Sequence, residues 1–239
     1  MNVMTSPWLL TGHLTPKRTD ALEPKLFRKL TAPQKASLRQ AFCEEVYQDG
    51  DPVPRDTTGI VLHGGLRESA RRRDGTCRVS GIVFTGEVLL PNGPRTAGVQ
   101  MTAMGETGLL SCGTERFAEL MHDIPQLRLN FLEEIQDRIC ETRRWHVMLG
   151  RKTAAERVAS LLFSFWQRQG CPPEMSLRLS REDLGQMLSL TFETVSRQIK
   201  AMEQAGMVAL PLPSRVRILD PQRLLNNTTG GAAMPRHAA

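Results

Sequence analysis

The chain has 239 residues, of which 40% are apolar and 23% charged, and its formal net charge is +6. This length is enough for two packed domains, and the composition excludes a disordered or collagen-like polymer. Every apolar run is shorter than the roughly 20 residues needed to cross a bilayer, and no basic segment precedes the short apolar patch near Met1. We therefore expect a soluble, cytoplasmic protein that does not insert into a membrane.

The basic residues are concentrated in the C-terminal part of the chain. Residues 151–239 contain twelve Lys or Arg and seven Asp or Glu, whereas residues 1–150 contain nineteen and eighteen. Such a charge excess attracts polyanions such as nucleic acid, although a solvated basic surface has the same composition.

The sequence lacks the common signatures of metal sites and enzymes. Its five cysteines are scattered singly, so neither a CxxC pair nor a disulfide framework is indicated, and we interpret them as reduced thiols. No GxSxG, HExxH, P-loop or Rossmann pattern occurs. We therefore predict that the protein is not an enzyme.

The segment from about Ala41 to Cys112 reads as β structure. Short apolar stretches alternate there with turn signals, and Asp74-Gly75 provides the positive φ that a tight hairpin turn needs. Several short strands at this spacing predict a small barrel or sandwich.

Helices are predicted from Thr114 onward. One short helix spans 114–123, and Pro125 can occupy the first turn of a longer helix that runs to about Gly150. This longer helix carries a seam with alternating spacings of three and four, made of Leu132, Ile135, Ile139, Thr142, His146 and Leu149. Such a heptad seam predicts a partner helix and hence a dimer interface, while packing against the chain's own β domain remains an alternative.

A further helix begins at Thr153, with Glu156 at the capping-box position, and ends at Gly170. Its apolar residues form one wide face, so this helix belongs to a separate core and places a domain boundary near residue 150.

The stretch from Leu179 to Gly206 predicts a helix-turn-helix. Ser180 caps a short helix, Thr191 caps a second one, and Gly206 ends it. At about 100° per residue, Val195, Ile199 and Met202 share one side of the second helix. The opposite side is polar and comprises Glu193, Arg197 and Lys200, with Ser196 at its flank.

This polar side has the chemistry that a DNA major groove requires. An Arg fork can bond guanine, a carboxylate can accept from cytosine, and hydroxyl or Lys groups can meet bases or phosphates. Two short strands follow, with Arg215 and Arg217 near their turn, as in a wing that touches the phosphate backbone. Together these segments predict a winged helix-turn-helix.

Over about residues 40–220 the chain resembles the Crp/Fnr family of bacterial transcription regulators, nearer to the Fnr and FixK branch. The most similar segments are AAERVASLLF (154–163), LRLSREDLGQMLSLTFETVSR (177–197) and GMVAL (206–210), and GIVLHGGLRES, DGTCRVSGIVFTGE and TAMGE agree more weakly. The resemblance implies an α+β fold with an N-terminal cyclic-nucleotide-binding-type β-roll (a jelly roll), a long dimerisation helix and a C-terminal winged helix-turn-helix.

The implied domains are a β-roll over 25–124, a dimerisation helix over 125–150 and a DNA-binding domain over 151–224. Loose tails are expected at 1–24 and 225–239, where Pro, Gly, Ala and Asn are frequent.

The resemblance also implies a function, namely a homodimeric regulator, most simply an activator, of genes for low-oxygen or nitrogen metabolism. Its partners would be double-stranded DNA and RNA polymerase. By the same resemblance Glu193, Ser196 and Arg197 read a TTGAT half-site, within a palindrome resembling TTGAT, four base pairs and ATCAA. The remaining candidate DNA contacts are Lys200, Thr191, Ser180, Arg215 and Arg217.

The signal that such a regulator senses is less well indicated. Fnr itself clusters three cysteines near its N-terminus around an iron-sulfur centre, whereas this chain has only Cys43 in its first seventy residues, which argues against that cofactor. A cAMP site, as in Crp, remains an alternative, and so does a ligand-binding module that acts through protein partners. The residues that resemble the family's nucleotide site are Gly86, Glu87, Arg95, Thr96 and Thr142, but the loop before Arg95 is shorter than the family's.

Overall fold

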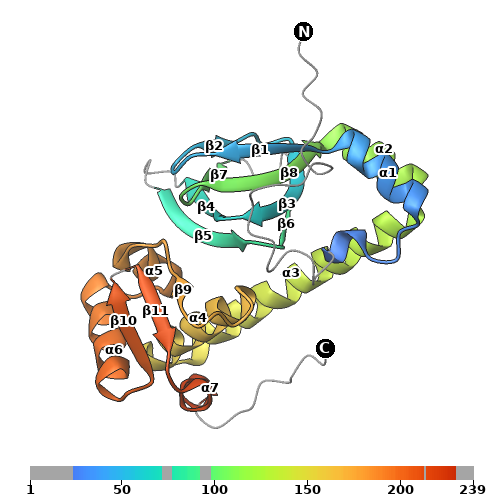
Figure 1. The fold of residues 1–239 in the computed structure, drawn as a ribbon. Helices are drawn as coiled ribbons and strands as arrows, with labels where there is room; N and C mark the ends of the chain where they lie inside the picture. The colour runs from blue at the N-terminus through green and yellow to red at the C-terminus, as the bar shows by residue number, and fades with distance from the viewer. Residues whose placement is uncertain (1–23, 72–76, 92–97, 213, 230–239) are drawn as a thin grey trace. The chain divides into compact units, whose positions relative to one another are not determined.

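The computed structural model describes residues 24–71, 77–91, 98–212 and 214–229. The chain forms two compact units (Figure 1). The first comprises residues 1–68 and 82–138, and the second comprises residues 69–81 and 139–239. Within the described ranges, no helix is both long and apolar enough to cross a membrane.

A β-roll of two four-stranded sheets forms the N-terminal part of the fold. One sheet has the order β1 (Cys43–Tyr47), β8 (Thr107–Gly113), β3 (Thr57–His63) and β6 (Val88–Leu89). The other has the order β2 (Pro52–Val53), β7 (Val99–Ala103), β4 (Gly65–Arg71) and β5 (Cys77–Phe84). The strands β4 and β5 are neighbours, as a hairpin requires, while the predicted Asp74-Gly75 turn lies outside the described residues.

The interior of the roll is apolar on both sheets. Strand β3 pairs antiparallel with β8 and places Val61 opposite Leu109, and both side chains are fully buried. Leu66, Val83 and Met101 from the other sheet complete this cluster. Alternating inward apolar residues on paired strands therefore build the core, as expected for a two-layered antiparallel fold.

A second core lies under helices at the end of the roll. A short 3-10 turn, η2 (Lys25–Phe27), and α1 (Ala32–Ala41) precede the strands, and α2 (Thr114–Asp123) follows them. Phe42 and Phe117 pack edge to face here, with their ring centroids 6.2 Å apart. The helix α1 was not predicted, although Thr31 and Gln34 form a capping box at its start.

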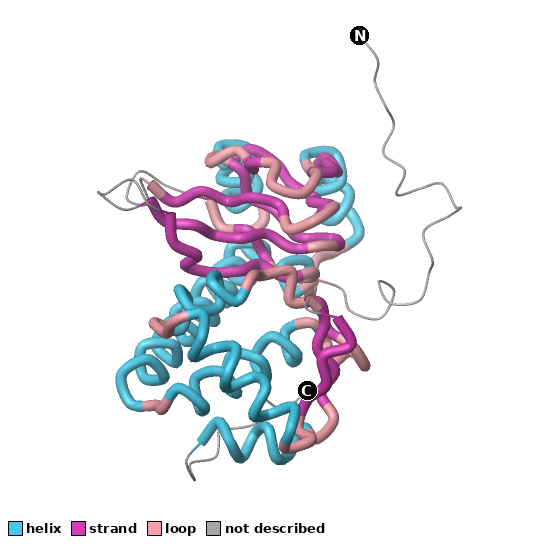
Figure 2. The backbone as a smooth tube through the Cα atoms, turned by 90° about the vertical axis from the view of Figure 1, so that its left-hand side faces the viewer, coloured by secondary structure: helices cyan, strands magenta, loops and turns pink. Residues whose placement is uncertain are grey.

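The long helix α3 (Pro125–Arg151) is continuous over 27 residues. After it come α4 (Ala154–Arg168), β9 (Met175–Ser176), α5 (Arg181–Leu188), α6 (Phe192–Gln204), β10 (Val208–Leu212), β11 (Arg215–Ile218) and α7 (Pro221–Thr229). The three strands form one antiparallel sheet in the order β10-β11-β9. Figure 2 shows these short strands together at one side of the C-terminal helices.

The core of this second unit is formed by the apolar faces of its helices. Leu161 and Phe165 of α4, Leu184 of α5 and Ile199 of α6 are each at most 1% exposed. Helix α6 packs against both α4 and α5. The predicted α+β class, with a roll, a long helix and a winged helix-turn-helix, is confirmed.

The predicted tail at 225–239 is wrong over residues 225–229, because α7 extends to Thr229. Asp220 accepts a hydrogen bond from the Arg223 N–H at 2.9 Å, and Pro221 occupies the first turn. Leu224 is fully buried and Thr228 is 1% exposed, and α7 packs against α4. The two predicted tails otherwise fall on residues 1–23 and 230–239, which lie outside the described residues.

Candidate DNA-binding surface

The turn between α5 and α6 is tight and has little tolerance for side chains. Ser189 ends α5 in the left-handed region, with φ of 53°. The Leu190 N–H donates to the Gly185 carbonyl at 2.9 Å, and a Cβ placed on Gly185 would lie 2.7 Å from the Leu190 carbonyl oxygen. Only glycine at this position lets the turn close so near to α5.

Helix α6 is anchored by its cap and by its apolar face. The Thr194 N–H donates to Thr191 Oγ1 at 3.3 Å, which caps the helix. Val195, Ile199 and Met202 are at most 2% exposed and pack into the core. The side of α6 that was predicted to face inward is therefore fully covered by the protein.

The opposite side of α6 is open to solvent. Glu193, Arg197 and Lys200 are exposed, and Ser196 is partly buried at the flank. Within the described residues, no hydrogen bond or ion pair occupies the side chain of Arg197 or Lys200. Hydrogen bonds from its own backbone N–H and from the Thr191 hydroxyl lower the pKa of the Glu193 carboxyl, so it is a carboxylate at neutral pH.

The two capping hydroxyls are already engaged. The Ser180 hydroxyl donates to Asp183 Oδ2 at 2.8 Å and accepts from the Asp183 N–H at 3.0 Å. The single proton of the Thr191 hydroxyl has two possible acceptors, Thr194 Oγ1 at 3.1 Å and the Glu193 carboxylate. Each hydroxyl has a single proton to donate, so a phosphate contact through either one would require its rotation out of the cap.

The predicted wing arginines meet an acidic neighbour. Arg215 and Arg217, both on β11, contact the two carboxylate oxygens of Glu174 at 3.1 and 3.4 Å. Both side chains remain more than half exposed. Glu174 was not identified from the sequence, and no local signal marks it, because its partners lie about forty positions further along the chain.

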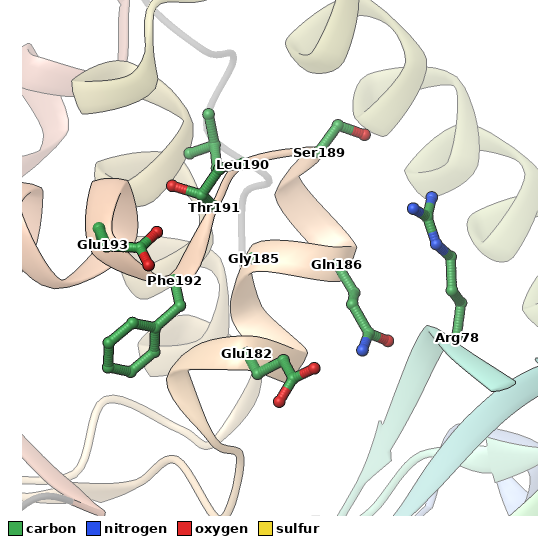
Figure 3. A pocket seen from close by; sticks show the side chains of 9 residues that line it. All are labelled: Arg78, Glu182, Gly185, Gln186, Ser189, Leu190, Thr191, Phe192 and Glu193. Carbon is green, nitrogen blue, oxygen red and sulfur yellow. The ribbon is translucent and has the colours of Figure 1, made fainter. Parts of the chain in front are cut away.

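An open pocket of about 550 Å³ borders the helix-turn-helix (Figure 3). One lining residue is Arg78, which comes from the part of β5 that belongs to the second compact unit. The other lining residues come from α5, the turn and the first residues of α6, and are Glu182, Gly185, Gln186, Ser189, Leu190, Thr191, Phe192 and Glu193.

Arg157 connects three backbone segments of the second unit and was also missed. Its guanidinium donates to the carbonyl oxygens of Leu149 at 2.7 Å, Lys152 at 3.0 Å and Leu188 at 3.1 Å. The end of α3, the start of α4 and the end of α5 are thus tied together. Carbonyl acceptors carry no sequence signal, so this contact could be seen only in the structure.

The residues that resemble a nucleotide site are only partly described. Gly86 adopts φ of 85°, and the Glu87 carboxylate accepts from the Phe84 N–H at 2.9 Å, which closes the turn between β5 and β6. Thr142 is exposed on α3, whereas Arg95 and Thr96 lie outside the described residues. In the described part of the chain, no group of three or more His, Cys, Asp or Glu side chains is placed to hold a metal ion.

The described residues leave most of the heptad seam of α3 uncovered. Leu132 is 53% exposed and Ile139 is 47% exposed. Thr142 and His146 are also exposed, while Ile135 and Leu149 are partly buried.

Comparison with known proteins identifies the family. A family model described as the Crp-like helix-turn-helix domain matches residues 156–226. The transcriptional activator protein FnrL of Cereibacter sphaeroides is 32% identical over 205 residues, which cover 80% of this chain and 82% of FnrL. This chain belongs to the Crp/Fnr family of transcription regulators.

Further relatives place this regulator in the Fnr and FixK branch of the Crp/Fnr family. The nitrogen fixation regulation protein FixK of Bradyrhizobium diazoefficiens is 29% identical over 168 residues, 69% of this chain and 70% of FixK. The structure of FixK2 from Bradyrhizobium japonicum shares the fold, with a TM-score of 0.72 at 24% identity, and the match covers 80% of this chain and all of that one. The predicted resemblance is confirmed, and the chain is a DNA-binding regulator of a family that is not enzymatic.

Proposed function

We propose that this Crp/Fnr regulator binds, as a homodimer, a palindrome resembling TTGAT, four base pairs and ATCAA. Glu193, Ser196 and Arg197 read the bases of each half-site. Lys200, Arg215 and Arg217 contact phosphates and set the register of the protein on the duplex.

The observation that carries this proposal is the open polar side of α6. Arg197 is exposed and has no partner within the described residues, so its fork is available for guanine O6 and N7. Glu193 lies four positions before Arg197 and is ionised, so the same face also offers an acceptor for cytosine N4. A G·C pair can therefore satisfy both side chains, with guanine bound to Arg197 and cytosine to Glu193.

The exposed seam of α3 supports the homodimer. Apolar side chains at heptad spacing that remain open to water are typical of a helix whose partner is a second copy of the chain. A two-fold symmetric dimer presents two recognition helices and therefore requires a palindromic site.

The names of the relatives indicate the biological role. FnrL is called a transcriptional activator, and FixK a regulator of nitrogen fixation. By this similarity the protein acts in the cytoplasm, activates genes for low-oxygen or nitrogen metabolism, and works together with RNA polymerase.

Fluorescence anisotropy with labelled duplexes at one stated salt concentration tests the proposal. The protein should prefer the palindrome to a scrambled duplex of equal length. Arg197→Ala should lose about 1–3 kcal/mol of discrimination at the G·C position, whereas Lys200→Ala should weaken all duplexes alike. Equal affinity for the palindrome and the scrambled duplex would refute the proposed site.

A further inference from the structure

Phe192 is a large apolar side chain in an unusual place. It is the first residue of α6, directly after the capping Thr191, and it is 52% exposed. Figure 3 shows its ring projecting from the start of the helix, clear of the helix ribbon. Within the described residues it takes part in no aromatic pair.

The position of Phe192 on α6 relates it to the proposed base-reading residues. Phe192 stands four positions before Ser196, just as Glu193 stands four positions before Arg197. Because residues four apart are neighbours on a helix surface, two columns of side chains run side by side along the first turns of α6. The first column consists of the apolar Phe192 and the hydroxyl-bearing Ser196. The second consists of the acidic Glu193 and the basic Arg197.

Phe192 also continues the apolar side of α6 beyond the core. It lies seven residues before the buried Ile199 and therefore on the same side of the helix. Nothing in the described part of the protein covers it as the core covers Ile199. Single exposed apolar residues are common on protein surfaces, but Phe192 differs from most of them because it lies beside the polar side of a recognition helix.

Base pairs offer one apolar group in the major groove, namely the 5-methyl group of thymine. The residues at the start of a recognition helix are those that meet base edges. We propose that Phe192 is a specificity-determining residue that packs its ring against a thymine 5-methyl group in each half-site. This inference rests on the proposed function and adds an apolar contact to the polar ones described above.

The test uses the full-length protein and a binding site selected by it from a random-sequence DNA pool. Each thymine of the selected half-site is replaced in turn by deoxyuridine, which removes only the methyl group and keeps base pairing. At one position the wild-type protein should bind about fourfold more weakly per half-site, the effect of about one buried methylene group.

Phe192→Ala should remove this sensitivity, so that thymine and deoxyuridine duplexes bind equally, and Phe192→Leu should retain part of it. Three results would overturn the proposal: a selected half-site without thymine, no sensitive position in the wild-type protein, or full sensitivity in Phe192→Ala. If Phe192→Ala weakens both duplexes while the sensitivity persists, the ring contacts the sugar-phosphate backbone and the proposal is also overturned.

Leu219→Ala is the matched control, because Leu219 is 51% exposed but follows β11 instead of belonging to α6. It should retain the fourfold methyl effect, and all variants should unfold at the wild-type denaturant midpoint. Other results would contradict the proposed function itself. Either no sequence would be enriched from the pool, or Arg197→Ala would leave the sequence preference unchanged.

Discussion

The helices α3 and α6 are both amphipathic, but they leave opposite sides open. On α6 the apolar residues Val195, Ile199 and Met202 are at most 2% exposed, and the polar side faces solvent. On α3 the apolar seam itself is open, with Leu132 at 53% and Ile139 at 47% exposure. The intact core beneath α6 makes it a rigid platform for a polar ligand, whereas α3 still has apolar surface to bury.

In the proposed homodimer, this contrast separates two requirements, namely a surface that reads DNA and a seam that joins the two chains. One chain would supply the whole of the proposed reading surface, because the winged helix-turn-helix closes its own core. In the proposed homodimer, the α3 seam that one chain leaves open to water would be covered by a second copy of the helix. Folding of the reading surface and assembly of the dimer should therefore respond to different substitutions.

Leu132→Glu should have the largest effect, because it places a charge in the α3 seam. The dimer should dissociate, which sedimentation velocity would show as a monomer. Affinity for a palindromic duplex should fall about 100-fold or more, since the avidity of two linked half-site contacts is lost. The monomer should remain folded, because Leu132 is 53% exposed within the chain.

Val147→Glu is the control for the seam. Val147 is 59% exposed on the same helix but follows the seam residue His146 and lies outside the seam. This variant should stay dimeric and bind DNA as the wild type does. A dimeric Leu132→Glu protein would show that the seam packs elsewhere and would break the contrast between the two helices.

Gly185→Ala should have the next largest effect, and it acts on α6 without touching α3. The added methyl group would lie 2.7 Å from the Leu190 carbonyl oxygen, so the turn must shift. Overpacking of this kind costs about 1–3 kcal/mol of the free energy of unfolding. Denaturant unfolding measures this cost, and DNA binding should weaken while sedimentation still reports a dimer.

Gly150→Ala provides the comparison on α3. A Cβ there meets nothing within 4 Å, and the residue lies near the end of a helix. The free energy of unfolding should stay the same or rise by about 0.5–1 kcal/mol. A loss in Gly150→Ala as large as that in Gly185→Ala would show that the clash with Leu190 is not the cause.

Local chemistry explains what the sequence revealed about these helices. The caps formed by Thr153, Ser180 and Thr191 involve partners three residues away, so their spacing is visible in the chain. The buried and open sides of α6 follow from helical periodicity alone. Thr31 carries the same capping signal, but the sequence does not indicate a helix there. Few apolar residues follow Thr31, and only Leu38 of α1 is buried.

Contacts between distant segments could not be predicted in this way. Glu174 meets Arg215 across 41 positions, and Arg157 binds the Leu188 carbonyl across 31. The sequence predicts a tail at the end of α7, because Gly, Ala and Asn are frequent from there to the C-terminus. Burial of Leu224 and Thr228 against α4 outweighs that local preference, and only the tertiary structure shows it.

Thr153→Ala should have a smaller effect, at the start of α4. The Thr153 hydroxyl accepts from the Glu156 N–H at 3.4 Å and donates to the Glu156 carboxylate at 2.8 Å. Loss of this capping box should cost about 1 kcal/mol of unfolding free energy at neutral pH, measured by urea denaturation.

The pH dependence of that cost gives a second check. Hydrogen bonds from the Thr153 backbone N–H and hydroxyl lower the pKa of the Glu156 carboxyl in the folded protein. A lowered folded pKa stabilises the protein above the unfolded pKa, and this contribution is lost as the pH falls through the folded value. The difference between wild type and Thr153→Ala should therefore shrink under acidic conditions. A difference that stays constant would assign the cost to the hydroxyl–backbone bond alone.

Glu174→Gln should have the smallest effect. It removes the negative charge that pairs with Arg215 and Arg217. If Arg215 and Arg217 contact phosphates as proposed, the Glu174 carboxylate competes with DNA for them, but exposed ion pairs contribute only about 0–1 kcal/mol. Affinity for any duplex should therefore rise about two- to threefold at low salt, and the gain should vanish at high salt, where exposed charges are screened.

Glu119→Gln on α2 is the control, because it makes the same charge change at another exposed arginine pair and should leave DNA affinity unaltered. If both variants gain equally, the increase reflects net charge, and the wing arginines do not contact phosphate.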